Sequence, residues 1–444
     1  MNDPHSRFIA AALWHGSLDE AQSILAAHPE IASSDIHAAA ILGDDDAVRR
    51  FLAEDPARAT AKGGPHGWDA LTHLCFSRYL RLDTSRSAGF VRAATALLDA
   101  GASASTGFFD PTHKPEPAWE SALYGAAGVA HHAELTRLLI ERGADPNDGE
   151  VPYHAPETTD IAALRALVES GRLTADSLTT MLLRKADWHD LDGIKYLLEH
   201  GADPNRMGGW PHGPLHQAIR RDNALANIEL MLDHGGNPAL RNREGRVSAL
   251  ELAARRGRRD VIELCAKRGI ALDWQGAERL IAACATDDGP AVRVIAEREP
   301  AVVREVLAQG GTLLAEFAGV GNTEGVRHLL HLGVPVTALY ESGDGYYGIA
   351  PDSTALHVAA WRARHTTVRL LIERGAPVDA QDGRGRTALT LAVRACVDSY
   401  WMNRRSPDSV AALLEAGASV QGVQFPSGYA EVDALLQSRR SRDR

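Results

Sequence analysis

Apolar and polar positions recur along this chain in a pattern that predicts many short helices arranged in pairs. Several segments close an apolar-faced helix with a Leu-Leu doublet and, shortly after it, a Gly; they are residues 97–103, 138–147, 197–205, 370–379 and 413–419. Gly readily adopts the left-handed backbone conformation that ends a helix. Each segment therefore predicts the end of the second helix of a pair.

Short Ala-rich stretches precede these helix ends and predict the first helix of each pair. Residues 248–254, 353–360 and 386–392 each combine small residues with a Leu. The small residues let the two helices of a unit approach closely, and the leading Ser or Thr can cap the first helix.

Together these segments resemble the ankyrin family, whose pattern runs Gly-x-Thr-Pro-Leu-His-x-Ala-Ala, then Gly-His, then Leu-Leu-x-x-Gly-Ala-Asp-x-Asn. The resemblance covers essentially the whole chain, and residues 250–269 and 356–375 keep the family's spacing. It implies an all-α solenoid in which helix–turn–helix repeats, joined by hairpin loops, form a curved superhelix with a concave groove.

The register of the pattern places about twelve repeats in one continuous array over residues 1–423. We expect them near 8–33, 34–66, 67–118, 119–149, 150–176, 177–211, 212–246, 247–276, 277–310, 311–352, 353–385 and 386–423. The first, second, fifth and ninth match the pattern least, and end repeats are expected to differ because they expose a face that inner repeats bury. Residues 424–444 are expected to form a C-terminal cap with a frayed basic tail.

Four insertions interrupt the family spacing. Two lengthen the hairpins and two lengthen the turn between the helices of one repeat; they are residues 103–117 and 337–352, and residues 77–89 and 396–407. The hairpin insertions carry Phe108, Phe109, Tyr346 and Tyr347, which we expect to be exposed aromatic anchors for a partner. The alternative is that loop insertions are simply tolerated and the rings pack back onto the stack.

The positions that ankyrin proteins use for recognition flank the hairpin Gly and follow the Ala-Ala of the first helix. In this sequence they are His66, Trp68, Phe76, Glu120, Glu157, Asp187, Trp188, His212, Arg220, Arg221, Arg255, Arg256, Trp361, Arg362 and Arg394. Aromatic groups recur at both ends, and the middle runs from acidic to strongly basic. Arg clusters favour carboxylate or phosphate partners, although an Arg in the last turn of a helix can also serve only its dipole.

The fifth repeat has an irregular first helix. Residues 151–156 contain two prolines, which break regular structure, and place Tyr153 and His154 between them. Both side chains are further candidates for partner binding, with a merely degenerate repeat as the alternative.

Charge and cysteine content narrow the class of protein. A net charge of −11 argues against a nucleic-acid or anionic-membrane partner. Cys75, Cys265, Cys284 and Cys396 are widely spaced without Cys-x-x-Cys, which indicates free thiols in a reducing compartment. No stretch approaches the roughly 18–20 apolar residues of a membrane span, and residues 1–18 hold no signal-peptide core. We therefore expect a cytoplasmic protein; secretion by another type of signal stays open.

Catalytic and cofactor signals are weak. His73, His216 and His357 occupy the Leu-His slot or its equivalent, which is a structural hydrogen-bonding position in the family. His212 and His216 have metal-ligand spacing, but His212 precedes Gly-Pro on a hairpin. Residues 343–348 match Gly-x-Gly-x-x-Gly without the strand-to-helix context of a dinucleotide site. No P-loop, His-Glu-x-x-His or nucleophile elbow is present, so we expect no metal and no cofactor. The missing motifs favour a protein without enzyme activity; an enzyme, which needs no contiguous motif, stays the alternative.

The sequence therefore favours a non-enzymatic module, monomeric because no heptad seam is present, that binds a protein or an acidic peptide segment in its groove. The alternative is a small-molecule or anion site, or an active site, in the middle of the groove. Glu157, Asp187, Trp188, His212 and the Arg pairs would form it, with long loops as lids. A third interpretation is a secreted effector that uses the same surface on a host protein. A deep pocket favours the second class, and an open groove favours the first.

Overall fold

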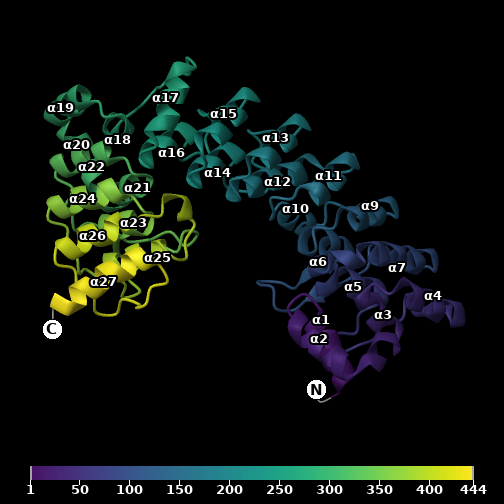
Figure 1. Cartoon of the computed structure of the whole chain (residues 1–444). Coiled ribbons are helices and arrows are strands. Elements are labelled where there is room, and N and C mark those ends of the chain that lie inside the picture. The colour runs from purple at the N-terminus through teal and green to yellow at the C-terminus, as the bar shows by residue number, and fades with distance from the viewer. Residues whose placement is uncertain (1–2, 443–444) are drawn as a thin grey trace. The chain divides into compact units, whose positions relative to one another are not determined.

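A computed structural model of the protein describes residues 3–442, and the chain folds as two compact units. We call residues 1–237 the N-terminal unit and residues 238–444 the C-terminal unit (Figure 1). In each unit, short antiparallel helix pairs stack on one another, and the described strands form only two small hairpins. The predicted all-α solenoid is confirmed.

The N-terminal unit holds two rows of helices. The helices before the first insertion are α1 (Pro4–Ala12), α2 (Leu18–Ala27), α3 (Ile36–Leu42), α4 (Asp45–Glu54), α5 (Ala70–Cys75), α6 (Arg78–Leu82) and α7 (Ser87–Asp99). Those after it are α8 (Ala122–Tyr124), α9 (Ala133–Glu141), α10 (Glu150–His154), α11 (Ala162–Glu169), α12 (Ala175–Asp187), α13 (Leu191–Glu199), α14 (Pro214–Arg220) and α15 (Leu225–Asp233). Helices α3, α5, α8, α10, α12 and α14 pack in that order as one row.

The C-terminal unit repeats this plan. Its helices are α16 (Ala249–Arg255), α17 (Arg259–Lys267), α18 (Ala277–Ala285), α19 (Gly289–Arg298), α20 (Pro300–Ala308), α21 (Gly310–Val320), α22 (Thr323–His331), α23 (Ala355–Trp361), α24 (His365–Glu373), α25 (Ala388–Ala395), α26 (Asp408–Glu415) and α27 (Ala430–Arg442). Residues 277–310 hold three helices where the pattern predicts two, because Pro300 ends α19 and starts α20. Helix α27 continues into the tail that we expected to fray, whereas residues 443–444 lie outside the described part.

Local chemistry explains the helix ends. The closing glycines of the quoted segments all have positive φ, for example 102° at Gly143 and 81° at Gly375, as the helix-stop pattern predicts. Side-chain caps begin the helices: Asp69 accepts from the backbone N–H of Thr72 at α5, and Ser248 forms a capping box with Glu251 at α16. The Leu faces are buried and form the core between the rows of each unit.

The insertions have structure of their own. Residues 103–117 enter the hairpin of β1 (Gly107–Asp110) and β2 (Ala118–Ser121), in which Phe108 lies opposite Glu120. Residues 337–352 lead from β3 (Leu339–Tyr340) towards β4 (Ser353–Thr354). Residues 77–89 form α6 and a 3₁₀ turn, and residues 396–407 contain the 3₁₀ turn η5 (Met402–Arg404).

Candidate functional site

An aromatic strip runs through the N-terminal unit from the loop before α5 to the loop before α14. Its neighbouring ring centroids lie 4.0–5.9 Å apart. The strip consists of His66, Trp68, Phe108, Phe76, Trp14, Tyr124, His154, Tyr153 and Trp210. The sequence pattern predicts most of these residues as candidates for partner binding, but not Trp14, Tyr124 and Trp210. Trp210 had a usable signal, since it lies two residues before His212 in the same hairpin.

A chain of alternating charges, which we call the charged series, lies beside the strip and ends on α14. His154 contacts Glu150 at 3.2 Å and Glu157 at 2.9 Å. Arg184 bridges Glu157 and Asp187. Asp187 also accepts from Arg221 at 2.8 Å and from Gln217 at 2.6 Å, which leaves its carboxylate fully engaged.

These contacts fix the charge of His154. Burial by itself lowers the pKa of a histidine, but here the hydrogen bonds to Glu150 and Glu157 outweigh it and raise the pKa of His154 to about 9. Burial acts in the opposite direction on Glu157, and the contacts with His154 and Arg184 lower the pKa of that carboxyl overall. The contact between His154 and Glu157 therefore favours the charged form of both side chains.

A pocket of about 270 Å³ opens beside the end of this series. It is lined by Tyr153, Leu183, Arg184, Asp187, Trp210, Pro211, His212, Gln217, Arg220 and Arg221. Tyr153 and Trp210 stack with an interplanar angle of 24°, and the guanidinium of Arg184 lies 4.1 Å from the centre of the Tyr153 ring. Arg220 is exposed, and the described residues give it no ion pair or hydrogen bond. It is the uncommitted cation of this pocket.

Glu120 lies elsewhere on the same unit, in the β1–β2 hairpin, and is almost enclosed. It is 4% exposed, and its Oε2 atom has no hydrogen-bond partner. Burial, followed by the nearby charges of Glu150 and Asp110, raises its pKa to about 7. The expectation that Glu120 and Phe76, which is 0% exposed, face a partner is wrong, because the aromatic strip and the hairpin cover both.

Two residues follow the Ala pair of each first helix, and the sequence pattern does not predict that they differ in exposure. The second of the two points inward in three repeats: Arg221 pairs with Asp187, Arg256 pairs with Glu316 at 3.0 Å, and Arg362 is 1% exposed. Successive residues on a helix differ by about 100° in direction, so two neighbours can meet different surroundings. The predicted cluster of free Arg side chains is corrected accordingly.

The first of the two residues after the Ala pair points outward, but in some repeats its side chain is held by contacts within the unit. Arg220 and Arg394 are exposed, whereas Arg255 is held by Glu278 and Gln309 on its own unit. Trp188, which follows α12, is 44% exposed and does not line the pocket.

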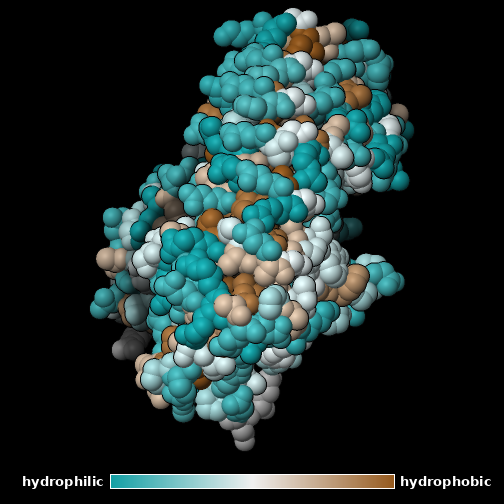
Figure 2. Space-filling model, turned by 90° about the vertical axis from the view of Figure 1, so that its right-hand side faces the viewer, coloured by the Kyte–Doolittle hydropathy of each residue, from teal (hydrophilic) through white to brown (hydrophobic). Residues whose placement is uncertain are grey.

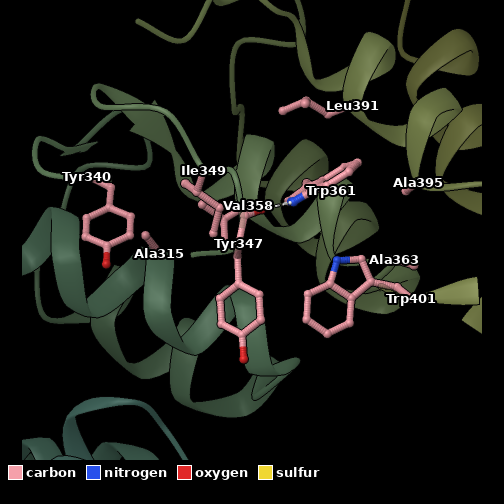
Figure 3. Close-up of a cluster of buried hydrophobic side chains, with 10 residues drawn as sticks. All are labelled: Ala315, Tyr340, Tyr347, Ile349, Val358, Trp361, Ala363, Leu391, Ala395 and Trp401. Carbon is pink, nitrogen blue, oxygen red and sulfur yellow. Dashed lines mark hydrogen bonds between the residues drawn. The ribbon is translucent and has the colours of Figure 1, made fainter. Parts of the chain in front are cut away.

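The aromatic insertions of the C-terminal unit pack on each other (Figure 3). Tyr347 is 1% exposed, and its backbone oxygen accepts from the indole N–H of Trp361 at 2.6 Å. The Arg362 guanidinium lies 4.7 Å from the ring centres of both Tyr347 and Trp401. Tyr347, Trp361 and Arg362 are therefore core side chains, and the prediction that they are exposed is wrong. Burying large rings stabilises the fold, so the insertions fold back.

Some aromatic surface stays open. Tyr346 is half-buried and stacks at 6.5 Å on Tyr400, which is 72% exposed, and Phe109 is 65% exposed. On the face shown in Figure 2, hydrophilic residues predominate and hydrophobic ones form small separate patches.

The histidines at the Leu-His slot make structural contacts. His73 donates through Nδ1 to the backbone oxygen of Asp69 at 2.9 Å, and burial lowers its pKa to about 3. His357 contacts Thr354 and the backbone oxygen of Ala380. Among residues 3–442 no group of three or more His, Cys, Asp or Glu side chains is arranged to hold a metal ion, and the rings of His212 and His216 stack with their centroids 5.9 Å apart. Within the same range no helix has the length and apolar character needed to cross a membrane.

Stacked helix pairs, glycine-closed second helices and capped Ala-rich first helices define a helical-repeat protein. A family model described as ankyrin repeats (3 copies) matches residues 313–422. Residues 313–422 therefore carry ankyrin repeats, and ankyrin repeats generally serve as protein–protein interaction modules.

Similarity to known proteins is local. The human 2-5A-dependent ribonuclease is 37% identical over 79 residues, which is 17% of this chain and 10% of that protein. The human ankyrin repeat and SOCS box protein 11 is 42% identical over 77 residues, or 17% and 23%. The serine/threonine-protein kinase 12 of Arabidopsis thaliana is 36% identical over 84 residues, or 19% and 16%. The chain thus spans less than a quarter of each of these relatives.

Among solved structures, one match is the crystal structure of the ankyrin repeat domain of Bcl-3, and the alignment covers 52% of this chain and 97% of the Bcl-3 chain. The sequence identity is 19% and the TM-score is 0.24.

Proposed function

We propose that this chain is a protein-binding ankyrin-repeat module whose N-terminal unit holds an acidic peptide segment of a partner. One carboxylate of that segment enters the pocket beside α14 and pairs with Arg220. The observation that carries the proposal is the exposed guanidinium of Arg220 at a pocket whose other charges are already matched.

The pocket has the size and chemistry for one acidic side chain. Its 270 Å³ lie just below the roughly 300–1,000 Å³ of typical small-molecule sites. Tyr153 and Trp210 offer apolar walls for the methylene groups, and Arg220 offers two parallel N–H donors to the carboxylate. Next to the pocket, the aromatic strip provides anchors for apolar residues of the same segment.

Selection from a random-peptide phage library on the full chain tests this proposal. We expect enriched peptides to place Asp or Glu near an aromatic or aliphatic residue. The Arg220→Ala variant should lose the acidic preference and bind the selected peptides about tenfold more weakly, because one charge-assisted contact is removed.

Arg137→Ala is the matched control, since Arg137 on α9 is also exposed and has no described partner. It should retain full affinity. Enrichment without acidic residues, or equal affinity of the Arg220→Ala variant, would contradict the proposal.

A second candidate function is a site for a free small anion in the same pocket. The converging polar groups of Gln217, His212 and Arg220 favour it. A ligand that binds only the folded protein raises its melting temperature. If small carboxylates or phosphates do so in the wild type and not in Arg220→Ala, while no library peptide binds, the free-anion function replaces the peptide function.

A further inference from the structure

The insertion at residues 77–89 builds a second cavity in the N-terminal unit, separate from the pocket at Arg220. The inserted helix α6 follows α5 directly, and its residues close a cavity of about 300 Å³ against the turn after α1. The side chains that shape it are Trp14, Phe76, Arg78, Arg81, Leu82 and Val129.

This cavity carries positive charge without an acidic neighbour in its lining. Arg78 donates through Nη1 to the backbone oxygen of Trp14 at 3.1 Å, and its shielded Nε has no partner. Arg81 is exposed, and the described residues give it no ion pair or hydrogen bond. By contrast, Arg86 in the same insertion pairs with Asp83 at 2.9 Å. Neither cation of α6 has a carboxylate partner among the described residues, and Arg81 makes no hydrogen bond there either.

The rest of the lining is apolar. Phe76 is 0% exposed and Val129 is 6% exposed, while the ring of Trp14 lies 5.7 Å from that of Phe76. Leu82, at the end of α6, is 50% exposed beside Arg81. An exposed Leu next to the Arg81 guanidinium places apolar contacts and anion contacts at one opening.

We propose that this cavity binds a carboxylate attached to an apolar body. The carboxylate pairs with Arg81 at the opening, and the apolar part lies on Trp14 and Leu82. Such a group occurs as a free aryl or alkyl acid and as an apolar C-terminal residue of a peptide. The inference does not depend on the function proposed for the Arg220 pocket.

Isothermal titration calorimetry on the full chain tests the assignment with two matched pairs of probes. One pair is 4-phenylbutyrate and 4-phenylbutyramide; the other is a tetrapeptide ending in Phe with a free or an amidated C-terminus. We expect at least one free acid to bind and its amide to bind about tenfold more weakly or not at all. Arg81→Ala should weaken the acid to the level of its amide, and Arg220→Ala should leave it unchanged.

The outcomes are distinguishable. Binding of the phenylbutyrate alone identifies a free acid as the ligand, and binding of the peptide alone identifies a C-terminus. No binding of either acid to the wild type, equal binding of acid and amide, or full affinity in Arg81→Ala overturns the proposal. Arg81 is exposed and makes no described contact, so the variant is expected to fold, which circular dichroism checks. Loss of binding in Arg220→Ala instead assigns the probes to the other pocket and also overturns it.

Discussion

Replacing Asp187 with Ala is expected to lower the free energy of unfolding of the N-terminal unit by about 3–5 kcal/mol, because two nearly buried cations lose their counter-ion. The side chains of Arg184 and Arg221 are 16% and 12% exposed, and both contact the Asp187 carboxylate. Gln217 loses its acceptor as well. Urea denaturation of the full chain measures the change, and hydrogen exchange of the α12 amides locates it in this unit.

The control comes from the same helix. Asp176, at the start of α12, pairs with Arg206 at 2.8 Å, but the two side chains are 62% and 44% exposed. Exposed pairs contribute about 0–1 kcal/mol, so Asp176→Ala should change stability little. If the two variants cost the same, burial does not set the strength of the charged series and our account of it fails.

The repeating helix pairs were predictable because each depends on a local signal. Gly143 and Gly375 end second helices with positive φ, as expected from the residues before them. Such signals need no knowledge of distant contacts. The same holds for the N-cap at Asp69, whose partner Thr72 is only three residues away.

The candidate site was harder to predict because exposure depends on segments far apart in sequence. Trp361 occupies the same repeat position as Arg220, yet it is 5% exposed. The insertions at 337–352 and 396–407 cover it, and their mutual packing through Tyr347 and Trp401 has no local signal. Repeat position alone therefore identifies an outward direction but not an open surface.

The spacing of residues along the sequence likewise did not predict which arginines form ion pairs or hydrogen bonds. Arg256 meets Glu316 from sixty residues further along the chain, and Arg255 meets Gln309. Only the assembled stack shows that Arg220 is left without a partner among the described residues. Arg220 and Arg81 differ from other exposed cations because each of them lines a cavity, the pocket at α14 and the cavity at α6.

Changing Glu120 to Gln is expected to alter how stability depends on pH. The pKa of Glu120 is raised from its ordinary 4.5 to about 7, so the folded state binds this proton more tightly than the unfolded state. Its contribution to stability is complete below pH 4.5 and is lost as pH rises to 7. A shift of this size corresponds to about 3 kcal/mol. The stability of Glu120→Gln relative to wild type should therefore increase by about that amount between pH 4 and pH 8.

The charged groups around Glu120 help to set its pKa and therefore the pH range over which stability changes. Glu150 and Asp110 raise its pKa after burial, whereas His154 and His113 oppose them. The raised pKa of His154, about 9, contributes stability that is complete below pH 6.5 and is lost as pH rises to 9. This second loss occurs in both proteins, so the difference between variant and wild type isolates the Glu120 proton.

Urea denaturation at half-unit pH steps gives the difference curve, with Glu116→Gln as the control from an exposed position of the same hairpin. The control should track the wild type at every pH. A Glu120→Gln curve parallel to the wild type would show that Glu120 is already ionised in the folded protein. The buried Oε2 atom of Glu120, which has no hydrogen-bond partner among the described residues, would then have to reach solvent or a donor in the folded protein.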